Sequence, residues 1–410
     1  MRLLITTNIF PPERHPSAII VKELIEYATD HGWQVSVVTG FPNHPFGRLF
    51  SGYKRKLIQV HDHNGYRLIR AWHLISASPA LISRALVMVS QTLAYLIGAL
   101  ACSHPDVVIN GPPPIIGPLI SGLIARAYGA KLVNVIYDIY PDAVINLGML
   151  KNRTLIAAAR KMERLTYFLS DHITVLSEGF RQTLILDKKV NSEKVSVIPI
   201  WLDGSEVSPQ DRDNNWRREI GIPLDKFIIL YAGTIGLISG AEVVAEAARL
   251  LASNSEILFL LVGTGQAKNR VEGMAREAGL KNIKFLPFQD RERLNEVQAT
   301  ADVSLVTLAP GSGKSSVPSK ILGYMAAARP IIASVDSDCD TAEIIREAGC
   351  GKVVSPNDAN ALAEGISYYF KRPQERQIAG LSGRRYFLEN FEKRKVLRNY
   401  LKLLSYLAKG

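Results

Sequence analysis

Cysteine is scarce in this sequence, with three residues among 410: Cys102, Cys339 and Cys350. They are widely spaced and form no C-x-x-C pair, which argues against a disulfide framework and against a zinc cluster. Such scarcity is typical of proteins in a reducing compartment. The sequence also lacks a basic run with interleaved aromatic residues. Nucleic acid is therefore the weakest class of anionic partner.

The segment Gly313-Lys314-Ser315 lacks the upstream glycine of a P-loop. That motif needs a glycine five residues before its second glycine, and Leu308 stands at that position. Nucleotide hydrolysis is thus a poor interpretation. The wider stretch 301–334 nevertheless predicts a buried strand, a polar Gly/Ser/Lys loop, a helix over 319–328 and a second strand. Free backbone N–H groups, two lysines and a helix start suit a phosphate group.

A hydrophobic run long enough for an ordinary membrane span is also missing. Residues 85–102 form 18 uncharged residues, whereas a spanning helix needs about 20 mostly apolar ones. Three interpretations of this helix stay open: a span, which is the weakest, contact with a membrane surface, and packing in a core. At the N-terminus, Met1-Arg2 leads straight into a strand, so we expect no signal peptide.

The charge of the chain is positive and uneven. The net charge is +11, and residues 1–200 hold 21 Lys/Arg against 13 Asp/Glu, or +8, while residues 201–410 hold 28 against 25, or +3. A basic first half suggests a phosphate-bearing substrate or an anionic membrane. The candidate patch, which is otherwise a solvated basic face, consists of Lys54, Arg55, Lys56, Arg67, Arg70 and Arg84.

Strand and helix patterns alternate along both halves of the chain. A chain of 410 residues exceeds what one core usually supports, and a polar break at about 201–216 separates the halves. This pattern predicts two α/β domains with doubly wound parallel sheets. Chemistry in such sheets lies at the carboxyl ends of strands. In the first half, the candidate loops follow Thr7, Thr39, Asn110 and Tyr137.

Two glycine turns and one lysine are the strongest candidates in the second half. Gly233, Thr234 and Gly236 follow a predicted strand and can hold a phosphate through backbone N–H groups, or form a tight turn without a ligand. Gly263-Thr264-Gly265 is a second such turn. Lys320 lies in the first turn of a predicted helix, where its charge opposes the helix dipole. That position suggests a neighbouring anion, with a solvated lysine as the alternative.

A series of short motifs, in this order over about 400 residues, resembles glycosyltransferase family 4 with its GT-B fold. Within that family it is similar to the subgroup that builds bacterial O-antigen, capsule and exopolysaccharide repeat units. The motifs are Phe10-Pro11-Pro12-Glu13, Pro42-Asn43-His44-Pro45-Phe46-Gly47, Gly52-Tyr53, Asp138-Ile139-Tyr140-Pro141-Asp142, Leu147-Gly148, Ser177-Glu178, Pro318-Ser319-Lys320, Tyr324-Met325-Ala326 and Pro330.

The resemblance implies two Rossmann-like domains facing across a cleft. Residues 1–200 would bind the acceptor, a C-terminal helix at about 386–410 would pack back on them, and residues 201–385 would bind the nucleotide-sugar. The implied reaction is retaining transfer of a sugar, an N-acetylated hexosamine or a deoxyhexosamine, from a UDP-sugar. The implied acceptor is a polyprenyl-diphosphate-linked sugar. The enzyme would need no metal or other cofactor and would lie peripherally at the inner face of the plasma membrane.

Four positions depart from the family pattern. Thr234 and Ser239 stand where many members place an Arg and a Lys that clamp the donor diphosphate. Ser315 and Gly323 stand where members place two glutamates, the second of which holds the ribose. Because a diphosphate needs compensating charge, we expect Lys320 to be a substitute clamp.

The site predicted from these arguments has three parts. Asp138 and Asp142 are the catalytic candidates, either of which could orient or deprotonate the acceptor hydroxyl; Asp142 is alternatively a helix N-cap. Asp336, Asp338 and Asp340 are expected to form a solvated capping loop rather than a metal site. The donor is assigned to Gly233, Thr234, Gly236, Gly263, Gly265, Ser316, Val317, Ser319 and Lys320, and the acceptor to Pro12, His15, Asn43 and His44.

Two rival functions remain on the same architecture. A UDP-GlcNAc 2-epimerase would need acid and base groups at C2 of the sugar but no acceptor. A catalytically degenerate binding protein would explain the four departures. The choice between a carboxylate nucleophile and front-face attack also stays open.

Overall fold

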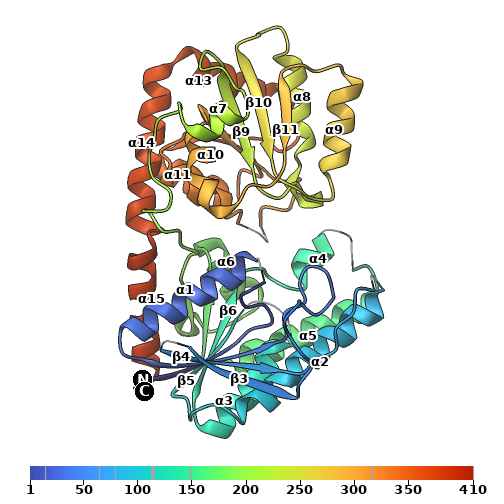
Figure 1. The fold of residues 1–410 in the computed structure, drawn as a ribbon, viewed down its shortest axis with the longest axis vertical. Coiled ribbons are helices and arrows are strands. Elements are labelled where there is room, and N and C mark those ends of the chain that lie inside the picture. The colour runs from blue at the N-terminus through green and yellow to red at the C-terminus, as the bar shows by residue number, and fades with distance from the viewer. Residues whose placement is uncertain are drawn as a thin grey trace. The chain divides into compact units, whose positions relative to one another are not determined.

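In the computed structural model the chain forms two compact units (Figure 1). Unit 1 comprises Met1–Ile198 with Leu397–Gly410, and unit 2 comprises Pro199–Val396. The described residues are 1–13, 15–63, 65–78, 80–111, 116–146, 148, 150–314 and 317–409. The predicted residues Ser315 and Ser316, and most of the loop after Asn110, lie outside them.

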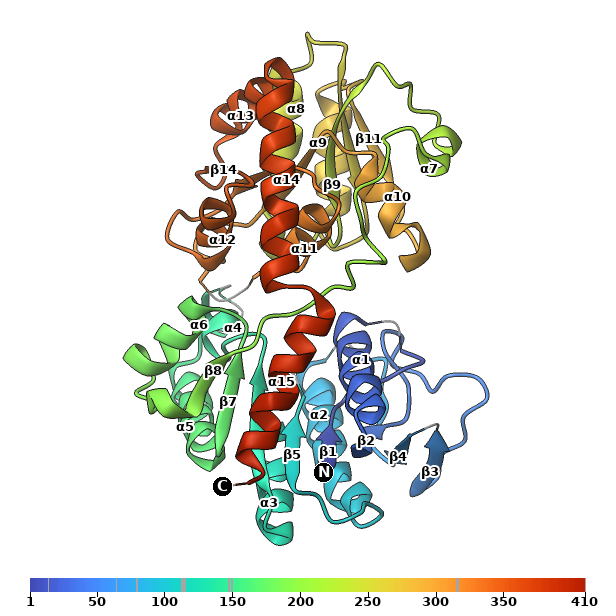
Figure 2. The same cartoon turned by 90° about the vertical axis from the view of Figure 1, so that its left-hand side faces the viewer.

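Unit 1 is built on an eight-stranded sheet in the order β3-β4-β2-β1-β5-β6-β7-β8. Helices α1 and α15 cover one face, while α2, α3 and α5 cover the other (Figures 1 and 2). The elements of unit 1 are β1 (Arg2–Thr6), α1 (Pro16–Asp30), β2 (Gln34–Gly40), β3 (Ile58–His63), β4 (Tyr66–Ala71), α2 (Leu81–Ala99), β5 (Val107–Asn110), α3 (Gly117–Tyr128), β6 (Lys131–Ile136), α4 (Asp142–Asn146), α5 (Arg153–Leu169), β7 (His172–Val175), α6 (Glu178–Gln182) and β8 (Val195–Val197), with most of α15 (Lys393–Leu407).

Unit 2 is built on a six-stranded parallel sheet in the order β11-β10-β9-β12-β13-β14. This is the 3-2-1-4-5-6 strand order of a Rossmann fold. The chain adds β9 to β11 outward on one side of the sheet and β12 to β14 outward on the other side, so the order changes side between β9 and β12. Its elements are α7 (Asn215–Glu219), β9 (Phe227–Ala232), α8 (Glu242–Leu250), β10 (Ile257–Val262), α9 (Lys268–Glu277), β11 (Ile283–Leu286), α10 (Leu294–Ala299), β12 (Val303–Thr307), α11 (Lys320–Ala326), β13 (Ile331–Ser334), α12 (Asp340–Ala348), β14 (Gly351–Val354), α13 (Ala359–Lys371) and α14 (Pro373–Asn390).

The strands of unit 2 are buried on both faces, as a doubly wound sheet requires. Along β9, Ile228 and Leu230 point into one core cluster, while Ile229 and Tyr231 point into the cluster on the opposite face. The period of two that separates successive side chains of a strand explains this alternation. The predicted fold class, two doubly wound α/β sheets, is confirmed.

Two elements differ from the predictions. Strand β3 was missed, and it runs antiparallel to β4 at the edge of an otherwise parallel sheet. Helix α14 was also missed, because it packs through small residues that give no amphipathic pattern. A Cβ on Gly380 would lie 2.2 Å from the carbonyl oxygen of Ala328. Since α14 packs in unit 2, the chain returns to unit 1 at Leu397 rather than at about residue 386.

Helix α2 contains most of the uncharged run at residues 85–102. Residues Ile82–Ala99 are long and apolar enough to cross a membrane, and 33% of them are buried in the structure. The buried side includes Gln91 and Tyr95, and α2 packs on β2 and β4. The Gln91 side chain donates to the carbonyl of Asn8, 2.6 Å away. These contacts attach one side of α2 to the sheet and leave the other side exposed.

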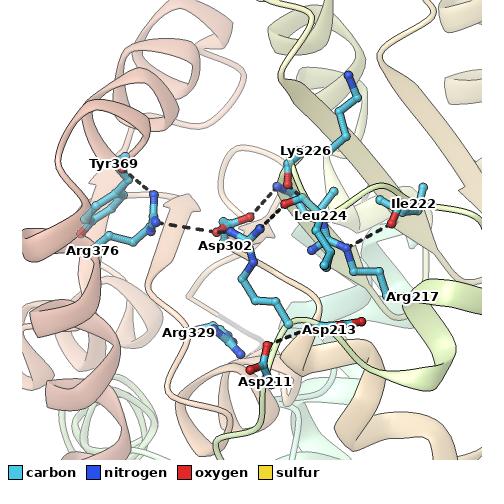
Figure 3. A network of polar contacts seen from close by, with 12 residues as sticks. Asp211, Asp213, Arg217, Ile222, Leu224, Lys226, Asp302, Arg329, Tyr369 and Arg376 are labelled. Carbon is cyan, nitrogen blue, oxygen red and sulfur yellow. Dashed lines mark hydrogen bonds and ion pairs between the residues drawn. The ribbon is translucent and has the colours of Figure 1, made fainter.

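A buried carboxylate organises the amino ends of the strands in unit 2 (Figure 3). Asp302, which immediately precedes β12, accepts a hydrogen bond from the Ile228 N–H at 2.8 Å and forms an ion pair with Arg212. Arg376 of α14 lies 3.8 Å from the same carboxylate. Because catalytic groups of such folds lie at the opposite, carboxyl ends, this network is structural.

Replacing Asp302 with Ala should therefore lower the free energy of unfolding by about 3–5 kcal/mol, because it leaves two arginines without their buried counter-ion. Urea denaturation of the full chain measures this change. The matched control is Asp213→Ala, which removes an exposed pair with Arg218 at 2.9 Å and should cost at most about 1 kcal/mol. Equal costs for both variants would contradict the assigned role.

Candidate functional site

Two glycine turns meet at the carboxyl ends of β9 and β10. A Cβ on Gly263 would lie 1.9 Å from the Gly233 carbonyl oxygen, and a Cβ on Gly265 would lie 2.2 Å from that of Ile235. Gly233, Gly263 and Gly265 have φ values of 136°, 154° and 153°, a region that favours glycine. The sequence places glycine here because the two loops touch through their backbones.

Some backbone N–H groups of the first turn are already used. Gly233 donates to the Val262 carbonyl at 2.8 Å, and Ile235 donates to that of Thr264 at 2.9 Å. The predicted phosphate cradle is corrected accordingly, since the Gly233 N–H is engaged within the protein. Thr234 and Gly236 make no such backbone bond within the residues that the structure describes. Their N–H groups are the donors that remain for a ligand.

Lys320, the first residue of α11, places its ammonium beside this turn. Its Nζ lies 3.6 Å from the centre of the Tyr231 ring and 3.6 Å from where a Cβ on Gly233 would stand. Across the described part of the chain, no hydrogen bond or ion pair reaches this ammonium. Burial lowers the pKa of Lys320 to about 7. An ammonium held in such a position would gain from a bound anion.

Tyr324 fixes α11 against the same strand end. Its hydroxyl accepts from the Ala232 N–H at 2.9 Å, and its ring is fully buried. The preceding residue, Gly323, faces Gln298 of α10, whose amide nitrogen would lie 3.3 Å from an added Cβ. Gln298 thus occupies the space beside Gly323, the position at which the family resemblance implied a glutamate.

The other predicted donor residues divide into exposed and inward-facing ones. Thr234 and Ser319 are exposed, whereas Val317 packs partly against the core. The Ser239 hydroxyl donates to the Gly236 carbonyl at 2.6 Å. This hydrogen bond lies within the turn that contains both residues. Lys314 forms an exposed ion pair with Asp338 at 2.7 Å. In the described ranges, no group of three or more His, Cys, Asp and Glu could hold a metal ion.

In unit 1, a buried carboxylate joins the loops that follow β1 and β2. Glu13 is 3% exposed, and its Oε1 accepts from the N–H groups of Asn43 and His44 at 2.9 and 2.8 Å. Its Oε2 accepts from the Phe10 N–H at 3.2 Å. One side chain therefore fixes both loops, because three backbone donors converge on it.

Glu13 brings most of the predicted acceptor residues together. The rings of His15 and His44 meet edge to face, with centres 5.4 Å apart. His15 also caps α1, since its Nδ1 accepts from the Ser17 N–H at 3.2 Å; burial, followed by the nearby His44, lowers the pKa of His15. The Asn43 amide turns back to the Phe41 carbonyl at 3.0 Å. Pro12 lies exposed in the first of the two loops.

Arg70 is buried and does not belong to the exposed basic patch that the sequence suggested. It is 1% exposed, and its guanidinium donates to the carbonyls of Gly40, at 2.8 Å, and Pro11. Arg67 is paired with Asp62 at 2.9 Å. Arg70 therefore supports the loops after β1 and β2 from beneath and does not face a membrane. Its position on strand β4, next to β2, is a long-range fact that no local pattern reveals.

The two catalytic candidates have different surroundings. The Asp142 carboxylate is held by Lys188 at 2.5 Å, and Arg160 lies 4.0 Å away. Lys188 also bridges to Glu163 at 3.0 Å. Asp138 is exposed after β6, and partial enclosure by the protein raises the pKa of its carboxyl group. In the described residues no ion pair engages Asp138, so it is the carboxylate of the two that is free to meet a substrate.

Exchanging Glu13 for Gln should loosen the loops after β1 and β2. The glutamine amide has one neutral acceptor oxygen in place of the two charged oxygens of the carboxylate. The free energy of unfolding should therefore fall by about 1–3 kcal/mol. Amide hydrogen exchange at Asn43 and His44 should speed up, while exchange in unit 2 stays unchanged. The matched control is Glu26→Gln, which removes the negative charge from an exposed ion pair with Lys22. Unchanged exchange at both amides would contradict the proposed support.

Comparison with known proteins agrees with this architecture. The sequence model named Glycosyltransferase Family 4 matches residues 17–205, and the one named Glycosyl transferases group 1 matches residues 212–386. The chain is 26% identical over 98% of its length to WcaI of Escherichia coli K12, covering 99% of that protein, whose name places it in colanic acid biosynthesis as a glycosyl transferase.

Solved structures repeat the fold at low sequence identity. Sucrose-phosphate synthase from Thermosynechococcus elongatus superposes with a TM-score of 0.78 at 18% identity, covering 99% of this chain and 98% of that one. Anabaena HepE in complex with UDP and glucose superposes with a TM-score of 0.71 at 14% identity, covering 99% of each chain. The chain accordingly belongs to glycosyltransferase family 4, with the GT-B fold, and is a glycosyltransferase of the bacterial polysaccharide biosynthesis type.

Proposed function

We propose that this glycosyltransferase moves a sugar, an N-acetylated hexosamine or a deoxyhexosamine, from a UDP-sugar to a lipid-linked acceptor with retention of configuration. The observation that carries the proposal is the Lys320 ammonium, which lacks an anionic partner among the described residues and lies beside the Gly233 turn. A donor diphosphate would supply the missing negative charge. The UDP bound to HepE, a protein of the same fold, supports this choice of nucleotide.

The chemistry assigned to the site breaks the bond between C1 of the sugar and the diphosphate oxygen. Lys320 and the free N–H groups of Thr234 and Gly236 stabilise the negative charge that develops on the leaving UDP. The acceptor hydroxyl forms the new bond to C1. Retention allows two routes. In the first, the Asp138 carboxylate bonds C1 as UDP leaves, and the acceptor hydroxyl then displaces that carboxylate, which takes up the hydroxyl's proton. In the second, front-face attack, the hydroxyl bonds C1 on the side of the leaving diphosphate, and its proton passes to an oxygen of that group. No step requires a metal or another cofactor.

The proposed acceptor, a polyprenyl-diphosphate-linked sugar, would bring the enzyme to the inner face of the plasma membrane as a peripheral protein. The loops after β1 and β2, held by Glu13, are assigned to this acceptor through His15, Asn43 and His44. The loop after β6 contributes Asp138. Because the acceptor carries phosphate, the excess of basic residues in the first half of the chain favours its approach.

A second candidate is a binding protein that has lost catalysis. Thr234, Ser239 and Gly323 favour it, because the usual clamp and ribose ligand are absent at these positions. Lys320 weighs against it, since the site retains one cation that a diphosphate can use.

The direct test of the function is a transfer assay. The full chain is incubated with a panel of UDP-sugars and with other nucleotide-sugars as controls, each with a polyprenyl-diphosphate-linked sugar. Transfer from a UDP-sugar with retained anomeric configuration, read by NMR of the product, is the expected result. Donor binding without transfer from any donor would favour the binding protein, and conversion of UDP-GlcNAc to UDP-ManNAc without acceptor would favour an epimerase.

The pH dependence of donor binding should depend on Lys320. Its free-state pKa of about 7 lies below the unfolded value, so a diphosphate that favours the charged form must raise it. UDP-GlcNAc affinity should be nearly constant below about pH 6 and fall about tenfold or more between about pH 6.5 and about pH 8.5. Calorimetry measures this change, because the charge of the diphosphate diester is constant in that range.

Lys320→Met should bind more weakly and lose this pH dependence. Lys314→Met is the matched control, since Lys314 already pairs with Asp338, and it should keep both affinity and slope. A Lys320→Met variant with unchanged affinity would remove Lys320 from the donor site.

A further inference from the structure

Helix α2 presents a continuous apolar stripe on its exposed side. The spacing of its members alternates between four and three residues, so they lie along one face of the helix. Each exposes between 39% and 82% of its surface. In the part of the chain that the structure describes, no segment covers them. The members of this α2 stripe are Ile82, Leu86, Val89, Leu93, Leu96 and Leu100.

The opposite side of α2 is fixed to the protein. Gln91, Thr92 and Tyr95 are buried, and the helix packs on β2 and β4. A helix held in this way cannot cross a bilayer without removing one layer of unit 1. Its apolar stripe is therefore available to a surface, because soluble proteins rarely leave a contiguous apolar patch of this kind without use.

The neighbouring helices of the same layer carry positive charge. Helix α3 packs against both α2 and α5, and the three helices cover one face of the sheet (Figures 1 and 2). Within α2, α3 and α5 the one acidic residue is Glu163, which is buried and paired with Lys188. Exposed basic residues on and before α5 are Lys151, Arg153, Arg160, Lys161 and Arg164, of which Arg160 lies 4.0 Å from Asp142.

Exposed apolar residues also occur on the other two helices. Leu123 of α3, and Leu155 and Phe168 of α5, expose more than half of their surfaces. An apolar stripe in a helical layer that carries exposed basic residues, with no exposed acid on its three helices, matches the interface of an anionic bilayer. Apolar side chains enter the headgroup boundary there, and lysine and arginine contact lipid phosphates.

We propose that the layer formed by α2, α3 and α5 docks on an anionic lipid surface, with the α2 stripe inserted at the interface. The choice of a membrane rests on the proposed lipid-linked acceptor. The same spacing of four and three residues would also allow the α2 stripe to pack against a helix of a second copy of this chain. An antiparallel two-fold contact of the whole layer, however, presents the same surface on both subunits and would place the basic residues of α5 from the two copies opposite one another.

The test is co-sedimentation of the full chain with phosphatidylcholine vesicles, with and without phosphatidylglycerol. Wild-type protein should bind the anionic vesicles and bind neutral ones more weakly. The double variant Leu86→Ser/Leu93→Ser should reduce partitioning about tenfold or more, because two inserted side chains are lost. Its matched control, Ile378→Ser/Leu381→Ser, changes two exposed residues of α14 and should bind as wild type does.

Two results would overturn the proposal. One is a wild-type chain that does not bind anionic vesicles; sedimentation velocity then shows whether the α2 stripe joins two copies, since Leu86→Ser/Leu93→Ser would dissociate that dimer. The other is equal vesicle binding by both double variants. Transfer to a water-soluble short-chain acceptor, measured without vesicles, stays unchanged in the Leu86→Ser/Leu93→Ser variant. Its absence from wild type would contradict the proposed function while leaving the docking result intact.

Discussion

The contact between two glycine turns at the ends of β9 and β10 is the constraint on which the donor half of the molecule depends. Gly263 approaches the Gly233 carbonyl so closely that a Cβ would stand 1.9 Å from it. The strands must end together for this contact, and the parallel register of β9 and β10 makes them do so. Within the described residues, the turn leaves the Thr234 and Gly236 N–H groups without a backbone acceptor, and the Lys320 ammonium lies beside it.

Lys320 illustrates how burial can prepare a site electrostatically. Removing an ammonium from water costs free energy unless an anion replaces the lost hydration. The Tyr231 ring compensates in part through a cation–π contact, and the low pKa of Lys320 reflects the rest. With the neutral residues Thr234 and Ser239 in the turn after β9, the positive charge beside this turn comes from a different element, α11.

Much of the fold was predictable because doubly wound sheets have a strong sequence pattern. Buried strands followed by Gly or Pro loops predicted both sheets, and the turn at Gly233 could be located from sequence alone. Prediction failed where the signal is tertiary. Helix α14 packs through Gly380 and other small residues, and Arg70 resembled a surface charge although it supports two loops. Glu13 was recognised as part of a motif, but three backbone donors converging on it required the structure.

The central claim, that burial holds the pKa of Lys320 near neutrality until a donor diphosphate raises it, is tested most directly by NMR. In protein with ¹³C-labelled lysine, the Cε resonance of Lys320, assigned through Lys320→Arg, is titrated with pH in the absence and presence of UDP-GlcNAc. The account predicts a pKa of about 7 in the free protein and a clear rise when the nucleotide-sugar binds. A free-state pKa near the ordinary lysine value of 10.5, or one that saturating nucleotide-sugar leaves unchanged, would contradict it.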